Sequence, residues 1–208
     1  MKIIIADDHF VVRKGLISIL KEAYPFAEIT EVSDAAELAK KTIKESYDII
    51  ISDFSMPGRS GIEMIKQIKE TAPKTPLLIL SNHPIEQFAV RVIKAGASSY
   101  LNKESAFEEL VNAVETLLRG KKFIPPEVAL LLADAFSGDV KNKEYESLSD
   151  REFEVLKLIS QGKTVSEAAE MLSLSVNTIS TYRSRILGKL NMHSTADLIK
   201  YAIEKGIV

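Results

Sequence analysis

The sequence predicts a doubly wound α/β domain followed by a smaller all-helical domain. Short apolar runs alternate with amphipathic, helix-like segments through residues 2–119, and each run has the length of a buried strand. From Ser147 onward the apolar residues recur only at helical spacing. Alternating strands and helices form a parallel sheet with helices on both faces, so the chain divides into an α/β part and an α part.

Five strands are expected in the first domain, and their apolar character sets their places in the sheet. Ile49 to Ile51 are consecutive β-branched residues, as in a strand buried on both faces, whereas residues 28–32 alternate as an edge strand does. The expected strands are residues 3–6, 28–32, 48–53, 77–80 and 99–101. The helices that follow them are residues 11–23, 35–45, 61–71, 85–95 and 106–119. We therefore predict a flavodoxin-like domain over residues 1–120, with five parallel strands in the order 2-1-3-4-5.

The pattern changes after Gly120. Pro125 and Pro126 interrupt it, residues 127–136 have the pattern of a short and mostly apolar helix, and residues 137–144 are polar and turn-rich. Residues 121–146 are therefore interpreted as a linker with a short helix. Because a helix this apolar would be poorly soluble if it were free, we expect it to pack on one of the domains.

The all-helical domain is predicted over residues 147–208. Ser149 and Glu152 form a capping box that begins its first helix. The other helices are expected at residues 165–172, 175–191 and 195–205. The first two of these, joined by a tight turn at Ser173 and Leu174, have the form of a helix–turn–helix, whose second helix would lie in the major groove of DNA.

Composition excludes several classes of protein. The chain has 208 residues, a formal net charge of -2 and no cysteine, which excludes thiol catalysis and thiolate metal sites. The N-terminal residues become acidic too soon for a signal peptide, and no apolar run approaches the length that spans a bilayer. We therefore expect a soluble, cytoplasmic protein that does not associate with membranes.

Charged and hydroxyl side chains follow several of the expected strands. Asp7 and Asp8 end the first strand, Asp53 the third and Ser81 the fourth, and Lys103 follows the fifth. In the predicted strand order these residues converge at the topological switch point. Three carboxylates repel one another unless a cation joins them, and oxygen ligands alone suit Mg²⁺. The cluster predicts that Asp53 attacks a phosphoryl donor, with Mg²⁺ and Lys103 neutralising the phosphoryl oxygens, so that an acyl phosphate forms.

Each residue of this cluster could also have an ordinary structural role. Asp7 or Asp8 could simply cap a helix, Ser81 could belong to a turn, and Lys103 could be a solvated lysine. However, a single register of the sheet places these four residues and Asp53 on one edge. A Mg²⁺-dependent phosphatase with an aspartyl-phosphate intermediate is a second possible function. Such an enzyme normally needs a second acid near the nucleophile, and residue 55 is serine. A third possible function is that of an interaction protein that is never phosphorylated. In such a protein the cluster of acidic residues would have no role.

Four segments of the first domain resemble the receiver domain of bacterial response regulators. They are Ile5-Ala6-Asp7-Asp8-His9, residues 48–58, Leu80-Ser81 and Ser99-Tyr100-Leu101-Asn102-Lys103. The resemblance covers residues 1–120 and implies that a sensor histidine kinase phosphorylates Asp53. It implies that Mg²⁺ is held by Asp8, Asp53 and the backbone carbonyl of Ser55, with Asp7 acting mostly through water. It also implies that Ser81 and Tyr100 form a switch pair, in which the hydroxyl moves toward the phosphoryl group and the ring turns inward.

The second helix of the helix–turn–helix has an apolar and a polar side. The apolar side is expected to face the core and comprises Val176, Ile179, Ile186, Leu187 and Leu190. The polar side carries small residues that permit close approach to base edges, namely Asn177, Ser180, Thr181, Ser184 and Gly188. Cations placed for phosphates are Lys163, Arg183, Arg185 and Lys189. Residues 148–208 carry a net charge of only about +1, which favours dimers on paired half-sites because a single copy would bind weakly.

This domain resembles the LuxR-type DNA-binding domain through residues 148–156, 162–164 and 177–190. The whole chain thus resembles a response regulator of the NarL/FixJ class, a transcription factor that catalyses only its own Mg²⁺-dependent phosphorylation and dephosphorylation. Many members carry lysine where Ser180 stands, and some where Ser184 stands, so Thr181 and Arg185 become the expected readers of bases. The resemblance implies a homodimer through residues 195–205. Phosphorylation at Asp53 is expected to shift a closed resting state toward an open dimer that binds promoter DNA.

Overall fold

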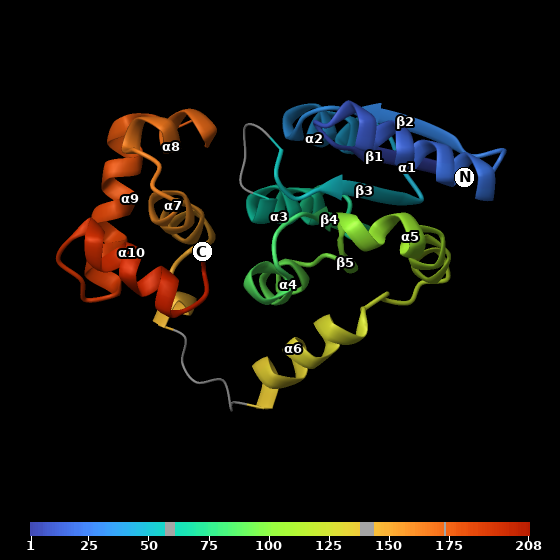
Figure 1. The fold of residues 1–208 in the computed structure, drawn as a ribbon. Coiled ribbons are helices and arrows are strands. Elements are labelled where there is room, and N and C mark those ends of the chain that lie inside the picture. The colour runs from blue at the N-terminus through green and yellow to red at the C-terminus, as the bar shows by residue number, and fades with distance from the viewer. Residues whose placement is uncertain (57–60, 138–143, 173) are drawn as a thin grey trace. The chain divides into compact units, whose positions relative to one another are not determined.

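The computed structural model describes residues 1–56, 61–137, 144–172 and 174–208. The chain forms two compact units, Met1–Gly138 and Asp139–Val208 (Figure 1). The predicted turn at Pro57 and Gly58, most of the predicted polar linker segment, and Ser173 of the predicted tight turn lie outside the described residues. Among the residues described, no helix has the length and apolar character needed to cross a bilayer.

The first unit contains a five-stranded parallel sheet in the order β2-β1-β3-β4-β5, which confirms the predicted topology. The strands are β1 Lys2–Ala6, β2 Glu28–Val32, β3 Ile49–Asp53, β4 Leu77–Ser81 and β5 Ser99–Asn102. The register pairs Ala6 with Ser52, Asp53 with Leu80, and Ser81 with Asn102. The carboxyl ends of β1, β3, β4 and β5 therefore lie in one row, which is the geometry that brings their following residues together.

Helices cover both faces of this sheet because alternate strand residues point to opposite faces. The helices are α1 Phe10–Ala23, α2 Ala35–Lys44, α3 Gly61–Thr71, α4 Ile85–Lys94 and α5 Lys103–Leu118. Ile3, Ile5 and Ile51 form one buried cluster with residues of α1 and α5. Ile4 and Ile50, which point the other way, are also fully buried, and α2, α3 and α4 cover that face (Figure 1).

Helix α5 begins three residues earlier than the sequence predicted. The side chain of Asn102 accepts a hydrogen bond from the backbone N–H of Glu104 at 2.9 Å, so Asn102 is the N-cap and Lys103 is the first helical residue. A cap of this kind satisfies a backbone donor that the helix itself leaves unpaired. The consequence is that Lys103 is held by a helix end rather than by a loop.

The apolar helix after the sheet domain is α6, Pro126–Ser137, and it packs on α4. The prediction that this helix packs on a domain is therefore confirmed, and the domain is the α/β unit. Figure 1 draws α6 in yellow, below α4 in this view. Among the α6 side chains that the structure describes, that of Val128 is fully buried, whereas Leu130 is 69% exposed.

The second unit is all-helical. It contains the short 3-10 helix η1 Glu144–Ser147 and the α-helices α7 Asp150–Ser160, α8 Val165–Met171, α9 Val176–Lys189 and α10 Thr195–Glu204. Three of these helices begin with a reciprocal capping box, in which the N-cap and the third helical residue bond each other's backbone N–H. The pairs are Ser149 with Glu152 in α7, Thr164 with Glu167 in α8, and Ser194 with Asp197 in α10. The capping box predicted for α7 is confirmed.

The core of the second unit differs from the prediction at the ends of its helices. Ile179 and Ile186 of α9 are fully buried as predicted, but Val176, which was expected to face the core, is 48% exposed. Val176 is the first residue of α9. The core also contains the ring of Tyr145, which packs on Phe153 with 5.4 Å between centroids.

Candidate functional site

The acidic edge of the sheet is built by the strand ends. Asp7 follows β1, Asp53 is the last residue of β3, and Lys103 begins α5 directly after β5. Asp7 is 0% exposed, Asp53 2% and Lys103 6%. Groups this charged are rarely buried unless they are paired. Here the Nζ of Lys103 lies 2.8 Å from Oδ2 of Asp7 and 2.8 Å from Oδ2 of Asp53.

Burial and pairing act in opposite directions on the protonation equilibria of Asp53 and Lys103. Burial raises the pKa of Asp53 above its ordinary value, although the hydrogen bond and charge of Lys103 act in the opposite direction. Burial alone would lower the pKa of Lys103, but the hydrogen bonds and charges of Asp53 and Asp7 outweigh burial, and its pKa is raised. Lys103 therefore stays cationic at neutral pH and is placed to neutralise charge that develops on Asp53.

Four side chains at this edge could hold a metal ion. They are Asp7, Asp8, His9 and Asp53, whose potential ligand atoms all lie within 4.8 Å of one another. Two oxygens bound directly to one Mg²⁺ lie at most about 4.2 Å apart, because each is about 2.1 Å from the ion. The residues therefore fit Mg²⁺ provided that at least one of them acts through water.

His9 is a member of this cluster that sequence reasoning did not assign. Its Nδ1 lies 2.8 Å from Oδ1 of Asp8, and its backbone N–H donates to Oδ1 of Asp7 at 2.7 Å. The side chain of His9 is 62% exposed. Its position next to Asp7 and Asp8 in the chain was the available signal, because the residue after a strand-ending acid pair lies at the same edge.

Ser55, Ser81 and Tyr100 are connected to one another through His83. The Nε2 of His83 lies 2.9 Å from Oγ of Ser55, and its backbone N–H donates to Oγ of Ser81 at 3.0 Å. Tyr100 is fully buried, and its hydroxyl donates to the carbonyl of His83 at 3.1 Å. Burial raises the pKa of Tyr100 to about 12, so the phenol stays a hydrogen-bond donor. The backbone N–H of Ser55 donates to Oδ1 of Asp53 at 3.2 Å, which fixes Ser55 beside the carboxylate.

His83 also joins an aromatic group behind the acidic edge. Its ring lies 5.9 Å from the ring of Phe54 and 5.0 Å from that of Phe88, centroid to centroid. Sequence reasoning missed His83, because its partner Ser55 is 28 residues away in the chain and no spacing rule connects them. The only local signal was its position two residues after Ser81.

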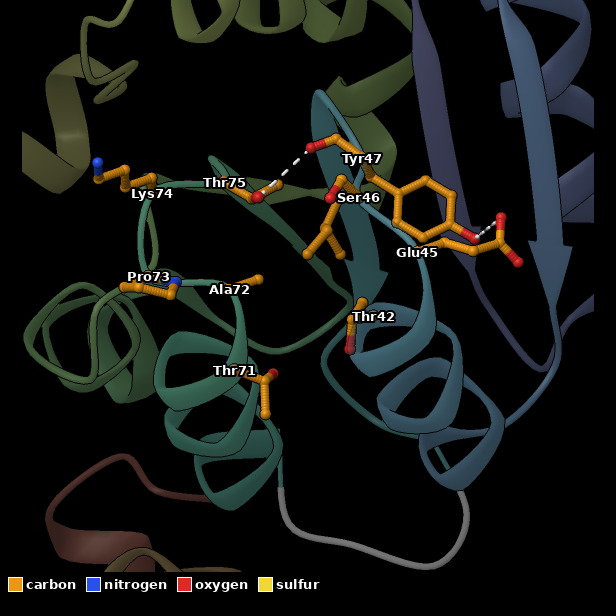
Figure 2. Close-up of a pocket in the computed structure, with 10 residues that line it drawn as sticks. Thr42, Glu45, Ser46, Tyr47, Thr71, Ala72, Pro73, Lys74 and Thr75 are labelled. Carbon is orange, nitrogen blue, oxygen red and sulfur yellow. Dashed lines mark hydrogen bonds between the residues drawn. The ribbon is translucent and has the colours of Figure 1, made fainter.

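A separate pocket of about 200 Å³ opens at the opposite edge of the sheet (Figure 2). It lies between the carboxyl-terminal ends of α2 and α3, where Oγ1 of Thr75 donates to the carbonyl of Tyr47 at 3.3 Å. Its lining contains none of the residues predicted for phosphoryl transfer or for DNA binding. This pocket is therefore distinct from the acidic edge.

In the second unit, the predicted DNA-facing residues are mostly exposed. Those exposed are Lys163, Asn177, Ser180, Thr181, Ser184, Arg185, Gly188 and Lys189, whereas Arg183 is half-buried. The hydroxyl of Thr181 donates to the carbonyl of Asn177 at 2.9 Å, and that of Ser184 donates to the carbonyl of Ser180 at 3.0 Å. These two hydroxyls keep their lone pairs free as acceptors on the outer side of α9.

Two of the predicted phosphate contacts already have partners inside the unit. The Nζ of Lys189 lies 2.6 Å from Oε2 of Glu152 and 3.2 Å from the carbonyl of Ser147. The Nη1 of Arg183 donates to Oγ1 of Thr195 at 3.2 Å. Lys189 thus ties α9 to the start of α7, and Arg183 ties α9 to α10. Arg185 and Lys163 are the predicted cations whose charges point into solvent.

Comparison with known proteins assigns both units. The response regulator receiver domain matches residues 3–115, and the bacterial regulatory proteins of the luxR family match residues 146–202. The oxygen regulatory protein NreC of Staphylococcus carnosus is 35% identical over 215 residues, covering 100% of this chain and 99% of that protein. Response regulator UvrY of Escherichia coli is 30% identical, covering 100% and 95%.

A solved structure resembles the whole chain as well. RcsB of Salmonella enterica serovar Typhimurium, bound to the rprA promoter in the presence of phosphomimetic BeF3-, is 29% identical, with a TM-score of 0.67 and 97% of each chain covered. The receiver and luxR-type matches each fall entirely within one of the two compact units of the fold. This chain therefore belongs to the response regulators of the NarL/FixJ class, which join a receiver domain to a LuxR-type DNA-binding domain.

Proposed function

We propose that Asp53 is the phosphoacceptor of this transcription regulator and that its phosphorylation controls DNA binding. The observation that carries the proposal is the position of Lys103, whose Nζ lies 2.8 Å from both Asp53 and Asp7 in a buried pair. A buried cation between two carboxylates is placed to bind the extra negative charge that a phosphoryl group brings to Asp53. The phosphoryl donor is the phosphohistidine of a sensor kinase.

The metal site consists of Asp8, Asp53 and the backbone carbonyl of Ser55, with Asp7 acting through water. Bound Mg²⁺ supplies charge neutralisation at the phosphoryl oxygens. The remaining work is done by the chain itself: Asp53 is the nucleophile, and Lys103 binds a phosphoryl oxygen. The only reactions that the protein catalyses are the formation and hydrolysis of its own acyl phosphate.

Ser81 and Tyr100 are the switch pair. The Oγ of Ser81 now accepts a hydrogen bond from the backbone of His83, and it would turn toward the phosphoryl group to donate a hydrogen bond. Tyr100 already lies inside the protein with its hydroxyl bonded to the carbonyl of His83. Both switch residues therefore act on the same short segment, which leads into α4.

Residues 147–208 form the DNA-binding domain, residues 1–120 the receiver, and residues 121–146 the linker. We assign Asn177, Ser180, Thr181, Ser184 and Arg185 to the bases and nearby backbone. Lys163 contacts phosphate. Arg183 and Lys189 contact phosphate only after they leave their present bonds to Thr195 and Glu152. Two copies form a homodimer through residues 195–205, and the dimer binds paired promoter half-sites. The protein acts in the cytoplasm.

The test combines phosphorylation and DNA binding in one experiment. The full chain and Asp53→Ala are incubated with acetyl phosphate and Mg²⁺, then analysed by intact mass and by binding to promoter fragments. We expect a phosphoryl adduct and tighter DNA binding for the unaltered chain alone. Steady release of phosphate from many equivalents of a phosphate ester would instead support a phosphatase, and an adduct on the Asp53→Ala protein would overturn the assignment of Asp53.

A further inference from the structure

Helix α6 is docked on the α/β unit by one side of the helix. It packs on α4. Among residues 126–135, whose side chains the structure describes, Val128 is fully buried. Pro125, just before the helix, is also buried, and its carbonyl accepts the N–H of Ala129 at 2.9 Å. Leu130 on the same helix is 69% exposed. Leu131, Leu132 and Ala135 lie on the same side of the helix as Val128 and are half-buried, so the docking covers apolar surface on that side of α6.

Helix α4 also contacts the residue that follows Asp53. Phe88 of α4 is 1% exposed, and its ring lies 4.9 Å from the ring of Phe54, centroid to centroid. Phe54 directly follows Asp53, and its backbone N–H donates to the carbonyl of Leu80 at 2.8 Å. Helix α4 thus contacts both the residue that follows Asp53 and helix α6.

The segment that leads into α4 is bonded to both switch residues. His83 donates its backbone N–H to Ser81 and accepts the hydroxyl proton of Tyr100, and Pro84 is the N-cap of α4. When Ser81 turns toward a phosphoryl group, His83 loses its acceptor, and the start of α4 must adjust. Packed side chains fit one arrangement and lose contact when an element shifts, because protein interiors are close-packed.

We propose that the docking of α6 on α4 is coupled to the phosphorylation state of Asp53, so that the phosphoryl group releases α6. The proposal rests on the proposed function of Asp53 and names the segment that senses it. Once released, α6 adds its 12 residues to the chain that joins the two units. A free helix of that length is marginal in water, so the released segment loses its helical structure.

Coupling of two equilibria is reciprocal. If a phosphoryl group loosens α6, then weakening the docking of α6 must tighten the binding of a phosphoryl mimic at Asp53. The variant that weakens docking is Val128→Ser, which removes the buried apolar side chain. Its matched control is Leu130→Ser, which makes a similar change on the exposed side of the same helix and leaves the docked surface intact.

The first measurement is hydrogen exchange of the α6 amides in the full chain, with and without beryllofluoride and Mg²⁺. We expect beryllofluoride to accelerate exchange in residues 126–137 by about tenfold, while the amides of β1 and β3 are unaffected. Val128→Ser is expected to exchange fast in both conditions, and Leu130→Ser to behave like the unaltered chain. Unchanged exchange in a chain that has bound beryllofluoride would overturn the coupling.

The second measurement is the equilibrium affinity for beryllofluoride in the presence of Mg²⁺, by calorimetry. Val128→Ser is expected to bind about fivefold more tightly than the unaltered chain and Leu130→Ser equally tightly. Equal affinities for all three proteins would overturn the coupling even if α6 had been displaced. If no protein binds beryllofluoride or gains a phosphoryl adduct from acetyl phosphate, the proposed function itself fails, which is a different result from failed coupling.

Discussion

The two units use buried charge for different purposes. In the α/β unit, Asp7, Asp53 and Lys103 are buried at the edge where the chemistry is proposed. In the helical unit, the residues proposed to contact DNA are mostly exposed, and the buried carboxylate is that of Glu152, paired with Lys189. Reacting groups gain strength when they are removed from water, whereas base and phosphate contacts require access. In the α/β unit the buried charges are therefore the groups of the proposed reaction, whereas in the helical unit the buried charge of Glu152 stabilises the fold.

The largest expected effect follows from Asp53. Asp53→Asn should abolish the acyl phosphate, because an amide oxygen is a poor nucleophile. Asp48→Asn is the matched control: Asp48 directly precedes the first residue of β3 and is exposed. Intact mass after incubation with acetyl phosphate and Mg²⁺ measures the outcome. An adduct of equal yield on Asp53→Asn would break the comparison, since a buried carboxylate would then have no chemical role.

Lys103→Met should slow formation of the acyl phosphate by about 100-fold, because a fixed charge that stabilises the transition state is lost. The exposed Lys40 provides a control of the same chemistry, and Lys40→Met should leave the rate unchanged. Both rates are measured by quenched time courses of the phosphoryl adduct. Equal rates for the two variants would show that the buried ion pair serves folding alone.

Arg185 and Lys189 sharpen the comparison within the helical unit. Arg185→Ala should weaken promoter binding by about tenfold and lower the slope of log affinity against log salt by about one. Lys189→Met should in addition lower the free energy of unfolding of this unit by about 1–2 kcal/mol, because Glu152 loses a charged hydrogen bond. Titrations at several salt concentrations and urea unfolding separate the two effects. An unchanged free energy of unfolding in Lys189→Met would show that its bond to Glu152 does not stabilise the unit.

The smallest effect is the pH dependence of stability that Glu152 contributes. Burial acts to raise the pKa of Glu152, but the bonds from Lys189 and Ser149 outweigh burial, and its pKa lies below the ordinary value of 4.5. Its stabilisation is therefore present above pH 4.5 and is lost as the pH falls through the folded-state pKa. Glu152→Gln keeps the capping box and should reduce this acid destabilisation by about 1 kcal/mol, measured by urea unfolding at pH 3 and pH 7. An unchanged pH profile would contradict the assignment.

The sequence predicted the elements that local chemistry determines. The strand order and the convergence of Asp7, Asp53 and Lys103 follow from alternation of strands and helices and from polar residues at strand ends. The start of α5 was wrong by three residues, because an asparagine cap can belong to a strand end as well as to a helix start. The bond of His83 to Ser55 and the pairing of Lys189 with Glu152 were missed, because both join residues far apart in the chain.

The capping boxes of α7, α8 and α10 have a consequence for how the chain folds. Each fixes the start of its helix with groups three residues apart, so these helices form from contacts that are close in sequence. The parallel sheet, in contrast, must pair β1 with β3 across the whole of α1, β2 and α2. Domains with local contacts fold faster than those with distant ones. We therefore expect the carboxyl-terminal unit to reach its native state first when the denatured chain is diluted into buffer.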